Sequence, residues 1–218
     1  MRFSEDILYA MPRGALIAIE GLDRTGKTTQ TEYLLDKLSK LKVKHKLVKF
    51  PQRDTDIGQL INTYLTNKSL LLNDQAAHLL FSANRWELSE QIKNDLNDGI
   101  TVVLDRYVYS GIAYSSAKGL DFDWCYAPDK GLPKPDLTIF LKFENEENSN
   151  RSGFGEERYE VVEFQRKVKL QFEEFTGNRE WCPLFVDGLD REQVHSRIWD
   201  LIEPTIKSVQ DKELLFFK

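Results

Sequence analysis

Residues 15–28 read ALIAIEGLDRTGKT, and this stretch decides the fold class of the chain. It opens with a continuous apolar run rich in isoleucine, as expected for a strand that is buried on both faces. Residues 28–41 then place leucines at helical spacing. Between them, residues 21–28 fit the pattern G-x-x-x-x-G-K-[ST] without a mismatch. A strand, a glycine loop and a helix in this order predict a phosphate-binding loop, or P-loop.

The P-loop predicts a nucleoside triphosphate as one ligand. Its glycines let successive amide N–H groups point inward, and the following helix adds the positive end of its dipole. Lys27 would reach the β- and γ-phosphates, and the Thr28 hydroxyl would ligate a bridging Mg²⁺. The motif leaves open what happens to the terminal phosphate.

Four further apolar runs read as strands, with helical patterns between them, at residues 46–50, 100–104, 137–143 and 184–186. This alternation predicts an α/β fold with a parallel sheet covered on both faces. One helix is expected over residues 74–96. The domain organisation expected is an N-terminal extension at 1–14 and a single domain at 15–218. The polar, glycine-containing stretch at about 144–158 is read as a lid, and the apolar tail at 211–218 has no assigned role.

Composition narrows the partners. The 218 residues carry a net charge of -5, with a pI near 5.4, which argues against broad attraction to nucleic acid or to an anionic membrane. Two cysteines do not make a disulfide framework and favour a reducing compartment. No segment approaches the roughly twenty apolar residues of a membrane helix. We expect a small-molecule ligand and a location in the cytoplasm, with the nucleus as a further location.

Side chains that follow the strands are the first candidates for chemistry, because ligands of open α/β sheets bind outside the carboxyl ends of the strands. Asp105 could approach a metal, or could only cap a helix or a turn. Arg106 beside it could clamp an acceptor phosphate. Arg53 could do the same or be an ordinary surface residue. Arg24, inside the P-loop, lies within reach of transferring oxygens unless it points into solvent.

The expected helix over residues 74–96 places Phe81 and Arg85 four positions apart, on one face. An aromatic ring beside a guanidinium suits a flat base, because the ring can stack and the guanidinium can donate to a carbonyl edge. Taken alone, Phe81 could equally be a core residue. The pair makes a nucleobase pocket a hypothesis.

Six strings in order carry a resemblance to a known family: GLDRTGKTTQ, FPQRDTDIG, LLFSANRWE, VVLDRYVYSG, GLPKPDL and FGEERYE. Together they identify the chain as similar to the thymidylate kinases, in their eukaryotic form and close to the fungal branch, from residue 15 to about 199. The resemblance implies a nucleoside monophosphate kinase fold of the P-loop class, with a five-stranded parallel sheet and a short lid. It also implies a homodimer, and a catalytic arginine in the P-loop, Arg24.

The resemblance assigns roles residue by residue. Phe81 would stack on thymine and Arg85 would bond its exocyclic oxygen, while Arg53 and Arg106 would clamp the dTMP phosphate. The dTMP site would consist of Asp23, Arg53, Phe81, Arg85, Arg106, Ser110, Gly111, Tyr114, Tyr159 and Gln165. The ATP site would consist of Gly21, Arg24, Thr25, Gly26, Lys27, Thr28, Thr29 and Arg151. The catalytic residues would be Arg24, Lys27, Asp105 and Arg106, and Mg²⁺ would be held by Thr28 and by Asp105, directly or through water.

Within that site, Asp23 would receive the 3′-hydroxyl of the sugar, with Gln165 a further candidate for this task. Tyr114 would crowd the 2′-position and so favour deoxyribose. Tyr159 would close over the substrate, and Arg151 would lie near the adenine.

The reaction expected is phosphoryl transfer from MgATP to dTMP, giving ADP and dTDP, in dTTP biosynthesis. A deoxynucleoside kinase is one alternative, because Asp105 could deprotonate a hydroxyl, but Arg53 and Arg106 would then lack an anionic partner. A regulatory nucleotide-binding switch is another. Against it, the chain has no Asn-Lys-x-Asp motif, and Asp-x-x-Gly occurs only within the P-loop.

Overall fold

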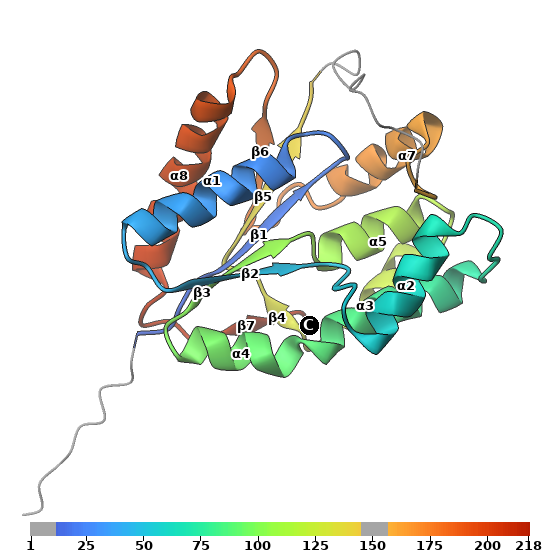
Figure 1. The fold of residues 1–218 in the computed structure, drawn as a ribbon, viewed down its shortest axis with the longest axis horizontal. Coiled ribbons are helices and arrows are strands. Elements are labelled where there is room, and N and C mark those ends of the chain that lie inside the picture. Colours follow the sequence, from blue (N-terminus) through green and yellow to red (C-terminus); the bar gives the residue numbers. More distant parts are fainter. Residues whose placement is uncertain (1–11, 145–156) are drawn as a thin grey trace, which may run out of the picture.

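A five-stranded parallel sheet in the order β2-β3-β1-β5-β6 forms the centre of the computed structural model, which describes residues 12–144 and 157–218 (Figure 1). This sheet and the α/β class confirm the predicted fold. The central strand β1 pairs in parallel with β3 on one side and with β5 on the other. The strands are β1 (Leu16–Gly21), β2 (His45–Lys49), β3 (Thr101–Asp105), β5 (Leu137–Lys142) and β6 (Trp181–Phe185).

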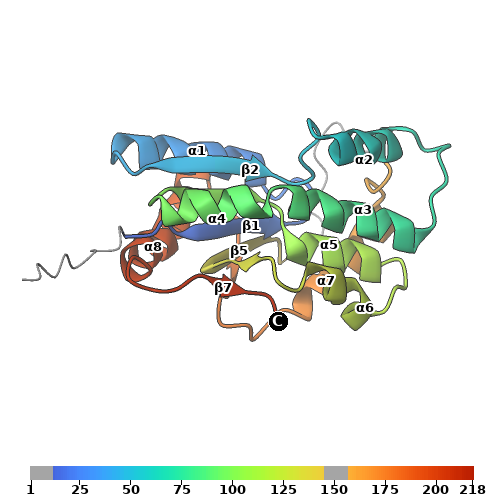
Figure 2. The same ribbon diagram turned by 90° about the horizontal axis from the view of Figure 1, so that it is seen from below.

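Helices cover both faces of the sheet because both faces of its strands are apolar. On one face, α1 (Lys27–Lys40) and α8 (Arg191–Ser208) bury Leu34, Leu38 and Ile198 in the same core cluster as Ile17 of β1. On the other face lie α4 (Ser89–Asn97), α5 (Val108–Ser116) and α7 (Val162–Glu173). Figure 2 shows this layering from below.

Two further helices, α2 (Asp56–Thr66) and α3 (Asp74–Glu87), lie beyond the carboxyl ends of the strands (Figure 1). They form a separate apolar cluster around Ile61, Tyr64 and Leu65. The short helices α6 (Phe122–Tyr126) and η1 (Ala127–Asp129) follow α5. Leu65 of α2 and Phe81 and Arg85 of α3 line a cleft together with residues that follow β2 and β3, and the site is built there.

The single helix predicted over residues 74–96 is wrong, because the chain forms α3 and α4 with a break at Leu88. The amide of Leu88 donates to the carbonyl oxygens of Arg85 and Trp86, and not to the one four residues back. The ladder of hydrogen bonds therefore ends and restarts. The break lets α4 pack Ile92 and Leu96 on the sheet while α3 extends toward the site.

The apolar tail forms a second sheet that the sequence did not indicate. Strand β7 (Leu215–Phe216) pairs antiparallel with β4 (Pro133–Lys134). The Phe217 side chain is buried, with its ring centroid 6.1 Å from that of Tyr107 and 5.7 Å from that of Tyr109. The tail therefore packs beneath the start of α5.

Both cysteines are free thiols. Cys125 is buried and Cys182 is half-buried. Across residues 12–144 and 157–218, no helix combines the length and the apolar character that crossing a membrane requires.

Candidate active site

The P-loop connects β1 to α1 through backbone conformations that favour glycine. Gly21 has a φ of 152°, and a Cβ there would lie 2.6 Å from the carbonyl oxygen of Leu141. Gly26 is left-handed, with a φ of 91°, and is the N-cap of α1. Arg24 is also left-handed, with a φ of 72°. The loop therefore turns sharply enough to present its amides at the N-terminus of α1, as anion binding requires.

Lys27 is buried at this turn, and its ammonium group donates to the carbonyl oxygen of Leu22 at 2.6 Å. Burial and, to a smaller extent, the charge of Arg106 lower the pKa of Lys27 to about 7, although the carboxylates of Asp23 and Asp105 oppose the shift. A phosphate group beside Lys27 would restore its charge. The side chain is thus placed to gain an anionic partner.

A cleft of about 500 Å³ opens next to the P-loop, bounded by the ends of β2 and β3 and by α3 and α5. Ten residues predicted from the sequence line it: Asp23, Arg53, Phe81, Arg85, Asp105, Arg106, Ser110, Gly111, Tyr114 and Tyr159. The cleft also contains residues that were not predicted: Lys49, Phe50, Pro51, Gln52, Asp54, Leu65, Tyr107, Ser115, Glu157 and Glu160. Nine of the ten predicted dTMP residues, all but Gln165, therefore share one cavity.

Arg106 is joined directly to the P-loop. Its Nη2 forms an ion pair with Oδ1 of Asp23, and its Nη1 donates to the carbonyl oxygen of Gly21 at 3.0 Å. Gln165 donates to the other oxygen of Asp23 at 3.1 Å. The guanidinium of Arg106 also lies over the Tyr114 ring, 5.4 Å from its centroid. Gln165 does not line the cleft, but it contacts the acceptor residues through Asp23.

Glu20 is a functional residue that the sequence reasoning missed. It is fully buried, and Oε1 accepts hydrogen bonds from the amides of Tyr107 at 2.8 Å and Ser110 at 3.2 Å. Its Oε2 accepts from the Ser110 hydroxyl, which in turn accepts from Arg106 Nη1 at 3.3 Å. Burial raises the pKa of Glu20. The one signal in the sequence was a glutamate directly after an apolar run, one residue before the first glycine of the P-loop.

Glu20 also supplies the N-terminal cap of α5. The helix has no cap from its own N-cap side chain, at Tyr107. The first N–H groups of a helix need acceptors, and a carboxylate at that end is also favoured by the helix dipole. Glu20 therefore fixes the start of α5, whose N-cap, Tyr107, directly follows Arg106.

Arg53 follows β2 and enters the cleft from the opposite side. Its guanidinium donates to Oδ1 of Asn62 at 2.7 Å and to Oε1 of Glu157 at 2.8 Å. Glu157 was not predicted as a partner. Arg53, which is predicted to bind the acceptor phosphate, is thus already paired with a carboxylate of this chain.

The inner end of the cleft contains Phe81 and Arg85 of α3. Arg85 is buried, and its Nε and Nη2 donate to the buried carboxylate of Asp129 at 3.1 and 2.6 Å. Gly111 of α5 allows the guanidinium to lie there, because a Cβ on Gly111 would come within 2.7 Å of Nη1 and Nη2. Gly111 therefore makes room for Arg85 as well as lining the cleft.

Tyr159 and Tyr114 form the outer aromatic wall, with ring centroids 5.7 Å apart. Between Tyr159 and the lid, Arg158 donates to the carbonyl oxygens of Tyr64, Asn67 and Leu70 at 2.6 to 2.9 Å. Arg158 is thus bound to the end of α2. Arg151 and most of the predicted lid lie outside the described residues.

Thr28 and Asp105 present the oxygen ligands that Mg²⁺ prefers. Thr28 is exposed in the first turn of α1, and Asp105 is half-buried at the end of β3. At nucleotide sites Mg²⁺ takes one or two protein ligands and completes its shell with water and phosphate oxygens. The two residues fit that pattern. In the described part of the chain, no three His, Cys, Asp or Glu side chains form a group able to hold a metal.

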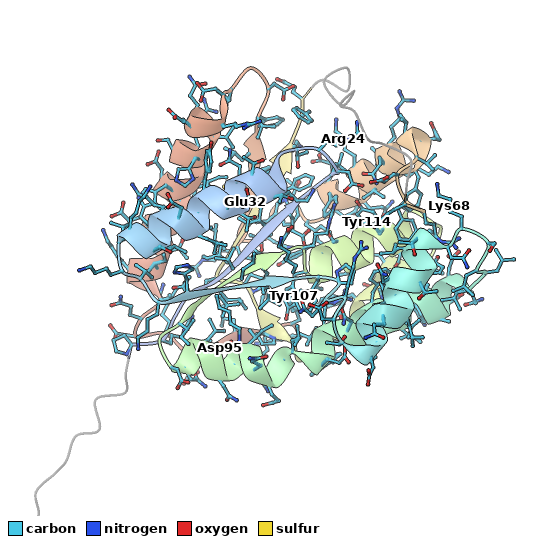
Figure 3. The ribbon with its side chains drawn as sticks, viewed as in Figure 1. Arg24, Glu32, Lys68, Asp95, Tyr107 and Tyr114 are labelled. Carbon is cyan, nitrogen blue, oxygen red and sulfur yellow. The ribbon has the colours of Figure 1, made fainter. Side chains whose placement is uncertain are left out.

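The remaining predicted ATP residues surround the same turn. The hydroxyl of Thr25 donates to the carbonyl oxygen of Leu22 at 3.0 Å, and Thr29 is half-buried in the first turn of α1. Figure 3 shows Arg24 at the P-loop and Tyr114 on α5, at the same end of the sheet. This arrangement can hold a triphosphate on the P-loop and a second anion in the cleft.

Comparison with known proteins gives a consistent result. A family model described as thymidylate kinase matches residues 19–198. The thymidylate kinase of Schizosaccharomyces pombe is 50% identical over 194 residues, which are 87% of this chain and 92% of that protein. The human thymidylate kinase is 42% identical over 207 residues, 94% of this chain and 97% of that protein. A solved structure of thymidylate kinase from Candida albicans is 49% identical and covers 94% of this chain and 99% of that chain, with a TM-score of 0.87.

Proposed function

The chain belongs to the thymidylate kinase family, and we propose that the cleft beside its P-loop binds dTMP through the residues described above. The enzyme transfers a phosphoryl group from ATP to dTMP, giving ADP and dTDP. The resemblance to the eukaryotic and fungal enzymes is confirmed, since relatives from both groups match most of the chain.

One observation supports the acceptor site most strongly. Arg53 and Arg106 line the same cleft, and Arg106 is bonded to the P-loop at Gly21. Two guanidinium groups can bind one phosphate through several charge-assisted hydrogen bonds. An acceptor that is itself a phosphate fits this pair. A deoxynucleoside, whose acceptor is a neutral hydroxyl, would offer no anion to either guanidinium, and each would keep only the carboxylate that it holds already, Glu157 for Arg53 and Asp23 for Arg106.

In the proposed mechanism the protein aligns two anionic groups and needs no general base. The attacking oxygen of dTMP is already anionic near neutral pH, so the loss of a proton is not part of the step. Arg53 and Arg106 would neutralise the acceptor phosphate, while Lys27 and Arg24 would neutralise the transferring group. Bringing such groups together in a water-poor site accounts for most of the catalysis in this reaction class.

We assign the nucleoside half of dTMP to the inner cleft. Phe81 would stack on thymine, Arg85 would donate to its exocyclic oxygen, and Tyr114 would crowd the 2′-position of the sugar. Asp23 would accept the 3′-hydroxyl, with Gln165 holding the carboxylate in place. In support, Gln165 donates to Asp23 and Tyr114 lines the cleft.

On the donor side we propose that Mg²⁺ is held by Thr28 and by Asp105, directly or through water. When bound, the ion would supply positive charge to the phosphate oxygens of ATP. The phosphates would be held by the backbone of Gly21 to Gly26 and by Lys27, with Thr25 and Thr29 beside them. Arg151 near the adenine stays a prediction, as does the division of the chain into an extension at 1–14 and one domain at 15–218.

A homodimer is also proposed, and the apolar surface of α2 and α3 supports it. Leu60 is 58% exposed and Leu79 is 47% exposed, and Trp86 also lies open on α3. Burying such side chains against a second copy would be favourable. Light scattering of the wild-type chain and of L60E/L79E tests this, since the dimer should dissociate in the variant.

We propose a cytoplasmic and nuclear location, which imaging of a fluorescent fusion tests.

The function is tested by an acceptor panel with ATP and Mg²⁺. Purified enzyme should consume ATP with dTMP much faster than with thymidine, AMP or CMP. The Candida albicans enzyme is described as having broad substrate specificity, so the panel should include purine and pyrimidine deoxynucleotides. Equal turnover of thymidine would exclude the phosphate clamp.

A further inference from the structure

The donors of Arg85 are divided between the protein and the cavity. Its Nε and Nη2 bond Asp129. Within the described residues, no hydrogen bond engages Nη1, although the side chain is only 2% exposed and lines the cleft. A buried N–H without a protein acceptor carries a desolvation cost that a ligand carbonyl can remove.

We propose that Asp129 is a positioning residue that sets base selectivity, by holding Arg85 so that only Nη1 faces the nucleobase. The proposal rests on the assignment of the cleft to dTMP. Asp129 does not line the cleft and would not touch the nucleotide. It acts on the base through the orientation of one guanidinium group.

The carboxylate of Asp129 is itself held firmly. It is fully buried in η1, and its Oδ1 also accepts a hydrogen bond from the Ser82 hydroxyl at 2.7 Å. A bidentate carboxylate fixes the plane of a guanidinium, which a single hydrogen bond would not do. The guanidinium lies directly against the backbone of Gly111, where a Cβ would come within 2.7 Å of Nη1 and Nη2. Asp129 and this close packing together hold the guanidinium in its observed orientation.

His78 offers no competing acceptor to Arg85. His78 is buried nearby on α3, and burial and the charge of Arg85 lower its pKa. Its Nε2 lies 2.8 Å from the carbonyl oxygen of Cys125 and its Nδ1 lies 2.7 Å from the Ser115 hydroxyl. Both nitrogens are thus occupied within the protein. Nη1 keeps its proton available for the ligand.

A guanidinium fixed in this way selects by hydrogen-bond polarity. It can donate but never accept, so it pairs with a carbonyl oxygen at the facing position of a pyrimidine. An amino group there, as in cytosine, would place donor against donor. A site built around a buried hydrogen bond rejects an analogue that leaves the site unpaired. If Arg85 could rotate away, the mismatch would cost much less.

The test compares Asp129→Asn with wild type on dTMP and dCMP. Asparagine keeps the size of the side chain but cannot hold the guanidinium by two charged contacts. We expect KM for dTMP to rise on the order of 10²-fold, as for loss of one partner of a buried charge pair. KM for ATP should stay within about twofold, because the P-loop is separate, and the dTMP over dCMP ratio of kcat/KM should fall at least about tenfold.

Asp123→Asn is the matched control, since Asp123 is an exposed carboxylate of the neighbouring helix α6. It should behave as wild type. An Asp129→Asn enzyme that folds and keeps its dTMP over dCMP ratio overturns the proposal, whatever happens to the overall rate. Wild-type turnover of dTMP is measured in the same assay, so failure of the proposed function is recognised separately.

If Asp129→Asn does not fold, a crystal structure of wild-type enzyme with dTMP decides. The proposal requires the Asp129–Arg85 pair to stay intact with Nη1 at the exocyclic oxygen of the base. An Arg85 that has released Asp129, or that meets the base through Nε, would overturn it.

Discussion

The Arg106 guanidinium is paired with the Asp23 carboxylate, so the group assigned to the acceptor phosphate and the group assigned to the acceptor sugar hold one another. Asp23 belongs to the P-loop, and Arg106 also bonds the P-loop carbonyl of Gly21. The donor and acceptor sites therefore share atoms along one short segment. Small displacements of that segment should affect transfer more than they affect ATP binding.

Arg106→Ala should lower kcat by about 10²-fold or more, because it removes a charge that opposes the repulsion of two phosphates. ATP affinity should change little. Arg106 has a φ of 64°, which strains alanine, so Arg106→Gly is the control that removes the side chain without that strain. For both variants, steady-state kinetics measure kcat and an ATP titration measures the affinity for ATP. An unchanged kcat in the glycine variant would remove Arg106 from the transfer step.

Glu20→Gln should destabilise the enzyme by about 2 kcal/mol, since it replaces charged acceptors of buried hydrogen bonds by a neutral amide. It should also raise KM for dTMP, because Ser110 and Arg106 lose their fixed neighbour. Urea unfolding measures the change in stability, and steady-state kinetics measure KM for dTMP. Glu32→Gln, at an exposed position of α1 labelled in Figure 3, is the control and should change stability by less than about 0.5 kcal/mol. Equal stability of the two variants would contradict the capping role.

Glu157→Gln should lower KM for dTMP by about 1.4- to fivefold, because Arg53 would no longer have to leave a carboxylate before binding phosphate. The size follows from the 0.2 to roughly 1 kcal/mol of a partly exposed ion pair. Glu163→Gln, on the exposed side of α7, controls for the loss of a negative charge nearby. A KM that rises in Glu157→Gln would show that Glu157 assists binding.

His78 should remain neutral at pH 6.5, since burial and Arg85 lower its pKa below its usual 6.5. The unfolded chain takes up this proton as pH falls through about 6.5, while the folded chain resists, so stability should fall between pH 7 and pH 5. An NMR titration of the ring protons, with urea unfolding at both pH values, measures this. A His78 resonance that titrates at or above 6.5 would refute the prediction.

Phe217→Ala should cost about 3 to 5 kcal/mol of stability, the range for removing a buried aromatic ring. Phe216→Ala is the matched control. Phe216 is the neighbour of Phe217 in the sequence but is 39% exposed, so its removal should cost little stability. Urea unfolding distinguishes them. Similar losses for both variants would mean that the tail does not pack as described.

The parts of the fold that could be predicted depend on local sequence. The strand before the P-loop was expected at residues 15–19 and is β1, Leu16–Gly21. It could be predicted because a continuous apolar run indicates a buried strand without reference to the rest of the chain. The last strand was expected at 184–186 and is Trp181–Phe185, since a strand at the sheet edge mixes buried and exposed residues. The break at Leu88 was missed because helical spacing continues across it.

The parts of the site that could not be predicted depend on distant partners. Asp129 stands in an ordinary turn-like sequence, and only the folded chain brings it to Arg85, 44 positions earlier. Glu157 meets Arg53 across 104 positions. The pairing of β7 with β4 likewise joins segments about eighty residues apart. No motif spacing encodes such contacts, whereas the P-loop carries its chemistry within eight residues.

The segment from Glu20 to Asp23 has a consequence for engineering. Glu20 caps α5, the Gly21 carbonyl holds Arg106, and Asp23 pairs with the same arginine. A chimaera that received this stretch from another P-loop enzyme would keep a triphosphate-binding turn and lose the supports of its acceptor clamp. The P-loop of this enzyme is therefore no interchangeable module, and residues 20–23 must be redesigned together with α5.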